Sequence, residues 1–224
     1  LEVAGGDLDG WRYILMSRLS GCSLADAWPE IPTAQRARLA AELGASMAAL
    51  HAIDTAGLGE LHPDWPRFLR AQRDGCVARQ RDRGLAPGWL DQIPGFLDTV
   101  ELEQSPQPAL LHTELMREHL LVDEGPGGWT LSGLFDFEPA MVGAAEYDLA
   151  AIGIFVTDAD PALLRPLLVA LGYRHDRLDA ALQRRCLSYA LLHRFSDLAW
   201  YLRRLPPPPD VTTLAALAAH WWPL

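Results

Sequence analysis

The sequence predicts a mainly helical α+β fold with one β-hairpin at its centre. Two short apolar runs, residues 120–122 and 129–135, flank a Gly/Pro-rich turn at 125–128, which is the pattern of a hairpin. Apolar residues recur at helical spacing through most of the remaining chain, with regular stripes in 33–51 and 177–202. Half of the 224 residues are apolar, so helices can surround the hairpin and bury a sizeable core.

One strand and two helices are expected in the first quarter of the chain. Residues 10–19 form a short apolar run that predicts a strand. Ser23 is expected to cap a short helix. A long helix is predicted at 33–51, because its apolar residues lie on one face: Leu39, Leu43, Met47 and Leu50. His51 closes this helix and is interpreted as a structural residue.

Two more helices are expected before the hairpin, at 63–83 and 89–102. The Arg residues of the first are interpreted as a solvated face, and Pro94 is expected to kink or divide the second. The helices expected after the hairpin are 144–156, 161–171, 177–202 and 211–222, with a polyproline spacer at 206–209 before the last. His193 lies on an apolar helix face and is interpreted as a satisfied core histidine.

Charge and composition narrow the classes of partner. The net charge is −10, and residues 101–160 hold twelve acidic residues against the single Arg117. Such a field disfavours nucleic acid and anionic membranes, and it favours cationic ligands or metal ions. All 19 basic residues are Arg, so the sequence holds no phosphate-binding Lys. No apolar run is long enough to span a membrane, and three widely spaced cysteines are typical of reduced thiols in a cytoplasmic protein.

Ionisable side chains gather at the open end of the predicted hairpin. Glu114 and His119 precede its first strand, and Asp136 follows its second strand. The hairpin should bring the two carboxylates near one another. Two carboxylates beside a histidine can hold a divalent cation and act as a general base.

These residues, in this spacing, resemble the aminoglycoside phosphotransferase family, a branch of the protein-kinase-like fold. Its catalytic loop reads H-G-D-x-x-x-x-N, followed by I-D and later by Y-D-x-A. The corresponding residues are His112-Thr113-Glu114, His119, Asp136 and Tyr147-Asp148. The resemblance implies a kinase-like C-terminal lobe that transfers the γ-phosphate of ATP, with Mg²⁺, to a hydroxyl of a small cationic acceptor. An amino-sugar antibiotic is the implied acceptor, and antibiotic resistance the implied role.

The resemblance also implies a role for each matching residue. Glu114 takes the position of the catalytic base, and Asp136 and His119 take those of the magnesium ligands. His112 and Asp148 take supporting structural positions. The remaining matches are Met16 for the adenine pocket, the backbones of Ser17 and Leu19 for hydrogen bonds to adenine, and Glu138 and Glu146 for cationic groups of the acceptor.

A complete enzyme of this kind has an N-terminal nucleotide lobe before its hinge strand. Residues 1–21 are interpreted as the residual hinge strand and 22–224 as the substrate-binding and catalytic lobe. Three explanations are open: the lobe was removed from a longer protein, it is supplied in cis or by another polypeptide in trans, or it was lost.

Two other functions remain open at the level of sequence. Glu114 replaces the family's Asp with a side chain about 1.5 Å longer, a displacement that can cost on the order of 100-fold in rate. His119 replaces an Asn, although hard cations prefer oxygen ligands. A catalytically inactive kinase-like module that binds a ligand or partner fits these departures. An iron site built on His112 and Glu114 is the third hypothesis, but it would require a fold with many more strands.

Overall fold

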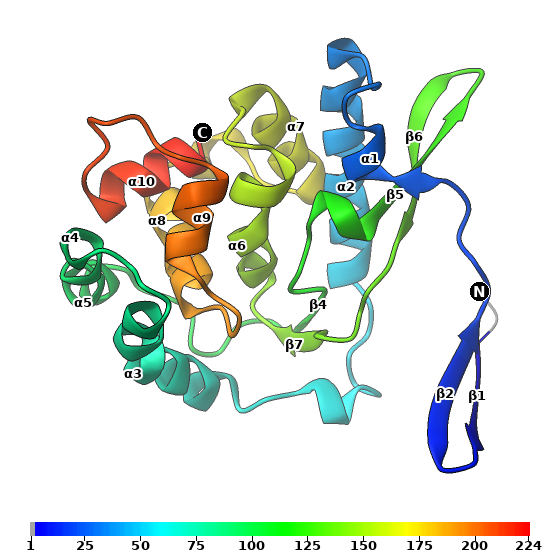
Figure 1. The fold of residues 1–224 in the computed structure, drawn as a ribbon, viewed down its shortest axis with the longest axis horizontal. Coiled ribbons are helices and arrows are strands. Elements are labelled where there is room, and N and C mark those ends of the chain that lie inside the picture. The colour runs from blue at the N-terminus through cyan, green and yellow to red at the C-terminus, as the bar shows by residue number, and fades with distance from the viewer. Residues whose placement is uncertain (1–2) are drawn as a thin grey trace.

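The computed structural model describes residues 3–224 and confirms a mainly helical α+β fold with a central hairpin (Figure 1). The strands are β1 (Val3–Leu8), β2 (Trp11–Met16), β3 (Cys22–Ser23), β4 (Ala109–Leu111), β5 (Leu120–Gly125), β6 (Gly128–Leu134) and β7 (Met141–Gly143). They form three small antiparallel sheets, in the orders β1-β2, β3-β5-β6 and β4-β7.

Helices make up most of the remainder. They are α1 (Leu24–Ala27), α2 (Thr33–His51), α3 (Trp65–Asp82), α4 (Pro87–Leu90), α5 (Ile93–Asp98), α6 (Leu149–Ala151), α7 (Pro161–Leu171), α8 (Ala180–Leu192), α9 (Leu198–Arg204) and α10 (Leu214–Trp221). Short 3₁₀ turns are η1 (Gly59–Leu61), η2 (Arg117–His119), η3 (Ala145–Asp148) and η5 (His175–Arg177), and η4 (Ile152–Val156) is π-helical. No helix among residues 3–224 has the length and apolar character needed to cross a membrane.

The predictions for α2 and α7 are confirmed at both ends. Leu39, Leu43 and Met47 of α2 are buried, as the apolar stripe predicts. The two helices pack closely because Gly44 has no side chain: a Cβ there would overlap the Leu167 carbonyl oxygen.

The central hairpin has a two-residue turn at Pro126 and Gly127, and a bulge between Leu121 and Val122. Helix α2 lies against the outer edge of β6. There the Gln35 side chain accepts the Trp129 N–H at 2.9 Å, and the Glu42 side chain accepts the Leu131 N–H at 2.9 Å. These bonds satisfy backbone donors that an edge strand leaves unpaired.

The N-terminal segment differs from its prediction. A two-stranded ribbon, β1 and β2, replaces the single strand expected at 10–19 (Figure 1). The chain turns at Asp9 and Gly10, both at positive φ, and the Asp7 carboxylate accepts the Gly10 N–H. Every side chain of β2 is exposed, so β2 does not contribute to the core.

Two buried strands were not predicted. β4 and β7 pair directly before and after the site, in segments for which the sequence analysis expects no strand. Gly143 is needed because the ring of Trp65 occupies the space that a Cβ would fill.

Three predicted helices are interrupted in the structure. The segment 89–102 is divided, and Pro94 lies in the first turn of α5. The segment 144–156 is helical but changes from 3₁₀ to α to π, while the Leu149 carbonyl accepts the indole N–H of Trp222. The prediction of one helix over 177–202 is wrong, because the chain is extended at His193 and α9 begins anew with Asp197 as its N-cap.

The C-terminal tryptophan pair and two of the three cysteines, Cys76 and Cys186, are buried in the core. Trp221 and Trp222 are fully buried against it. All three cysteines are free in the described chain, and burial raises the pKa of the Cys76 thiol to about 11. A thiol that stays protonated is a poor nucleophile, so Cys76 is a packing residue.

Candidate active site

A buried carboxylate organises the loop between β4 and the hairpin. Asp148 is fully buried, and its carboxylate accepts the backbone N–H groups of His112 at 3.2 Å and Thr113 at 2.7 Å. The same carboxylate lies 2.8 Å from Nε2 of His51. These three contacts compensate the cost of removing the carboxylate from water. Asp148 therefore ties 112–113 to the end of α2.

Thr113 adopts a backbone conformation that sequence reasoning did not anticipate. Its φ of +71° is unfavourable for a β-branched residue. The family motif has Gly at this position, which is the sequence signal that could have revealed it. His193 donates from Nε2 to the Thr113 carbonyl at 3.1 Å, and the Thr113 hydroxyl donates to the Pro139 carbonyl at 3.3 Å.

His112 connects this loop to the end of β6. Its Nε2–H donates to the Phe135 carbonyl at 2.8 Å, so Nδ1 accepts the Glu114 N–H at 3.3 Å. Burial lowers the pKa of His112, which favours this neutral tautomer. Both ring nitrogens serve the backbone, and His112 holds Glu114 and Phe135 in place.

His119 joins the Glu114 loop to Asp136. Its Nδ1–H donates to the Glu114 carbonyl at 2.8 Å, and its Nε2 lies 3.4 Å from Oδ2 of Asp136. In the neutral tautomer two lone pairs face each other, an arrangement that suits a shared proton or a bound cation. Asp136 has a φ of +67° and a side chain that is 46% exposed, so it is open to a ligand.

No group of three or more His, Cys, Asp or Glu side chains suited to a metal occurs in the described residues. A cation at His119 and Asp136 would therefore have two protein ligands. The Asp136 carboxylate fits Mg²⁺, which is commonly held by one or two carboxylates and completed by phosphate oxygens and water, whereas the His119 nitrogen is a poorer ligand for this hard cation.

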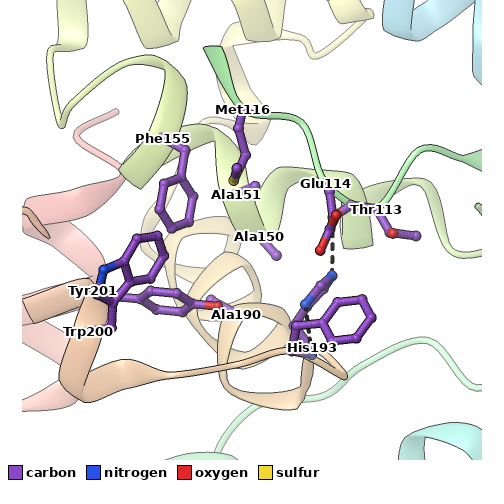
Figure 2. Close-up of a pocket in the computed structure, with 11 residues that line it drawn as sticks. Thr113, Glu114, Met116, Ala150, Ala151, Phe155, Ala190, His193, Trp200 and Tyr201 are labelled. Atoms are coloured by element: carbon purple, nitrogen blue, oxygen red, sulfur yellow. Dashed lines mark hydrogen bonds between the residues drawn. The ribbon is translucent and has the colours of Figure 1, made fainter. Parts of the chain in front are cut away.

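The Glu114 carboxylate faces a small open cavity (Figure 2). Within residues 3–224 this carboxylate has no hydrogen bond or ion pair, so it is available to a ligand. The cavity measures about 90 Å³ and is lined by Thr113, Glu114, Met116, Ala150, Ala151, Phe155, Ala190, His193, Phe195, Trp200 and Tyr201.

The segment between α8 and α9 forms hydrogen bonds to the loop at Thr113 and to the loop after Asp136. His193 binds the Thr113 carbonyl, and the Arg194 guanidinium donates to the Pro139 carbonyl, three residues after Asp136. The sequence predicted His193 as a satisfied core residue, and it is buried and hydrogen-bonded. Its role in holding the catalytic loop was missed, because the break at this position was not predicted.

Burial, and the neighbouring charge of Arg194, lower the pKa of His193 to about 4. His193 therefore takes up a proton below about pH 6.5 in the unfolded chain, whereas in the folded chain it stays neutral until about pH 4. The free energy of unfolding decreases as pH falls from about 6.5 toward 4. We expect His193→Gln, which keeps a donor for the Thr113 carbonyl, to reduce this slope by up to about 1.4 kcal/mol per pH unit. Urea unfolding between pH 6.5 and 5.5 measures it, with exposed His175→Gln as the control. An unchanged slope contradicts the assignment.

The other predicted site residues are distributed more widely. Leu19 lies over β6, against Gly133, three residues before Asp136. Met16 is exposed at the end of β2, Ser17 follows it, and Glu138 is exposed in the turn after Asp136. Glu146 is not with this group: it lines a separate cavity and forms a two-bond ion pair with Arg185, at 2.7 and 2.9 Å.

Solved structures with the same architecture are antibiotic phosphotransferases. The GDP complex of aminoglycoside 2'-phosphotransferase-IIIa has a TM-score of 0.65 at 19% identity, over 84% of this chain and 62% of that one. A thermostable mutant of APH(4)-Ia has a TM-score of 0.59 at 21% identity, over 92% and 74%. Macrolide 2'-phosphotransferase MphH from Brachybacterium faecium has a TM-score of 0.51 at 22% identity, over 76% and 60%. None of the curated proteins matches this sequence.

The fold is thus that of the kinase-like phosphotransferases. The family model for the phosphotransferase enzyme family, APH, matches residues 2–182, and the chain belongs to this family. It spans 62% of the length of the 2'-phosphotransferase-IIIa structure.

Proposed function

We propose that this chain is the acceptor-binding and catalytic lobe of a phosphotransferase. It moves the γ-phosphate of ATP to a hydroxyl of a small, cationic acceptor of the antibiotic type. Residues 1–21 contribute the hinge, in which Met16 at the end of β2 and the following Ser17 and Leu19 contact adenine, and 22–224 form the catalytic lobe. A nucleotide lobe, in cis or in trans, completes the enzyme, which works in the cytoplasm and contributes to antibiotic resistance.

The observation that carries the proposal is that His119 links the Glu114 loop to Asp136 at the open end of the hairpin. His119 contacts the Glu114 carbonyl and the Asp136 carboxylate through opposite ring nitrogens. The free Glu114 carboxylate can then accept the proton of an acceptor hydroxyl and orient its oxygen. Asp136 and His119 would hold Mg²⁺, which when bound would neutralise the charge of the ATP phosphates.

Nucleotide binding is the first measurement. We expect calorimetry to detect Mg²⁺-ATP binding to this chain, and Asp136→Ala to weaken it at least tenfold, because the carboxylate ligand is lost. GTP is titrated in parallel, since the 2'-phosphotransferase-IIIa structure contains GDP. Asp123→Ala removes an exposed carboxylate of β5 as the control. Equal affinity in wild type and Asp136→Ala would exclude Asp136 as the metal ligand.

A second candidate is a catalytically inactive module of the same family that binds a ligand or partner. It is favoured by the longer carboxylate at Glu114 and by the imidazole at His119. Acceptor binding that is the same with and without nucleotide, together with no turnover after a nucleotide lobe is supplied, would establish this second function.

A further inference from the structure

We propose that the acceptor is an amphiphilic alcohol with a single amine, and that its apolar part packs on an aromatic wall beside Glu114. The wall is made of Phe155, Trp200 and Tyr201. This inference rests on the proposed function, because it takes the Glu114 carboxylate as the point where the acceptor hydroxyl binds.

The three rings of the aromatic wall lie against one another along the cavity (Figure 2). Phe155 stacks on Trp200 with ring centroids 5.2 Å apart, and it meets Tyr201 edge-on at 5.4 Å. Phe155 and Tyr201 are buried, while Trp200 is 42% exposed. Trp200 therefore offers ring surface at the cavity mouth that an apolar ligand can cover.

The lining of the cavity defines what enters it. The cavity of about 90 Å³ is open to solvent and is lined mostly by apolar and aromatic side chains. An alkyl substituent or a ring edge is therefore favoured there over a sugar, whose hydroxyl groups would lack partners. The rest of the acceptor would lie outside, over Trp200 and the 48% exposed Phe195.

The charge of the cavity argues against a polyamine. Glu114 is the only acidic residue among those that line it in the described structure. Glu146 is neutralised by Arg185 in another cavity. Each amine placed against apolar surface without a partner is costly. A single amine can be satisfied here by Glu114 and by the ring faces of Trp200 and Phe195.

Direct binding without nucleotide tests this inference separately from phosphotransfer. The probes are a macrolide with one dimethylamino sugar and kanamycin, a polyamine, titrated by calorimetry into the whole chain. We expect the macrolide to bind at least tenfold more tightly than kanamycin, and Trp200→Ala to weaken its binding at least tenfold. Val169→Ala, which removes an exposed apolar side chain on α7, should leave it unchanged.

A variant that adds a negative charge to the aromatic wall should change the affinities of the two probes in opposite directions. Trp200→Glu should weaken macrolide binding and strengthen kanamycin binding, because a second carboxylate then lies beside Glu114. Phe195→Glu serves the same purpose if Trp200→Glu fails to fold. Kanamycin binding that equals or exceeds macrolide binding in wild type would overturn the inference, as would no binding of either probe at millimolar concentration. Mg²⁺-ATP binding that depends on Asp136 would still support the proposed function in both cases.

Discussion

Asp148→Asn is expected to destabilise the fold by about 3 kcal/mol. It removes a fully buried carboxylate that contacts the backbone N–H groups of His112 and Thr113 and the His51 ring. An amide can still accept one backbone N–H, but its own NH₂ group then faces His51 or the second N–H. For a chain of this length the midpoint of thermal unfolding should fall by roughly 6–12 °C. Urea and thermal unfolding at pH 7 measure the effect.

Asp176→Asn, on an exposed Asp paired with Arg174, is the matched control and should change stability by no more than about 0.5 kcal/mol. A double-mutant cycle with Thr113→Gly tests the cause. Gly relieves the positive φ that Asp148 helps to impose. The contacts of Asp148 are then no longer offset by that strain, so Asp148→Asn should be more costly in this background. Additive effects would mean that Asp148 does not hold Thr113 in its strained conformation.

Glu114→Gln should lower the rate of phosphotransfer by roughly 10²–10⁴-fold while leaving nucleotide affinity unchanged. The amide keeps the shape of the side chain but cannot accept the proton of the acceptor hydroxyl. ADP release, measured with the acceptor and with the nucleotide lobe supplied where turnover requires it, gives the rate. Glu114→Asp should also be slow, by on the order of 100-fold, because the site is built around the longer carboxylate.

Glu118→Gln changes an exposed Glu in the same loop and should retain full turnover. Retention of more than about a tenth of the rate in Glu114→Gln would rule out its role as the base, on the scale that general-base catalysis contributes. A higher rate in Glu114→Asp than in wild type would instead support the inactive-module function, in which the longer carboxylate impairs catalysis.

Sequence periodicity was most informative where one face of an element is buried. The stripe of α2 gave both of its ends correctly, and the apolar runs of β5 and β6 located the hairpin. Periodicity was misleading across His193, because apolar residues continue on both sides of it. At the break the side chains of His193 and Arg194 bind backbone carbonyls of distant loops, and no local pattern reports such contacts.

The candidate site was only partly accessible to sequence reasoning. Motif spacing singled out Glu114, His119 and Asp136. In the structure His119 contacts the backbone carbonyl of Glu114 and the carboxylate of Asp136. The motif spacing did not reveal that Glu146 is neutralised by Arg185, which lies 39 positions further along the chain. Thr113 was also missed, although the glycine at that position in the family motif is a signal for positive φ.

The sequence by itself determined α2, α7 and the hairpin, the acidic character of 101–160 and the motif residues around the hairpin's open end. Local spacing and composition carry this information, because they act within one helix face or one turn. Only the tertiary structure decided the free state of the Glu114 carboxylate, the strain at Thr113 and the aromatic wall beside the site. These features depend on side chains from α6, α8 and α9 that meet the loop through packing and burial, which no single segment encodes.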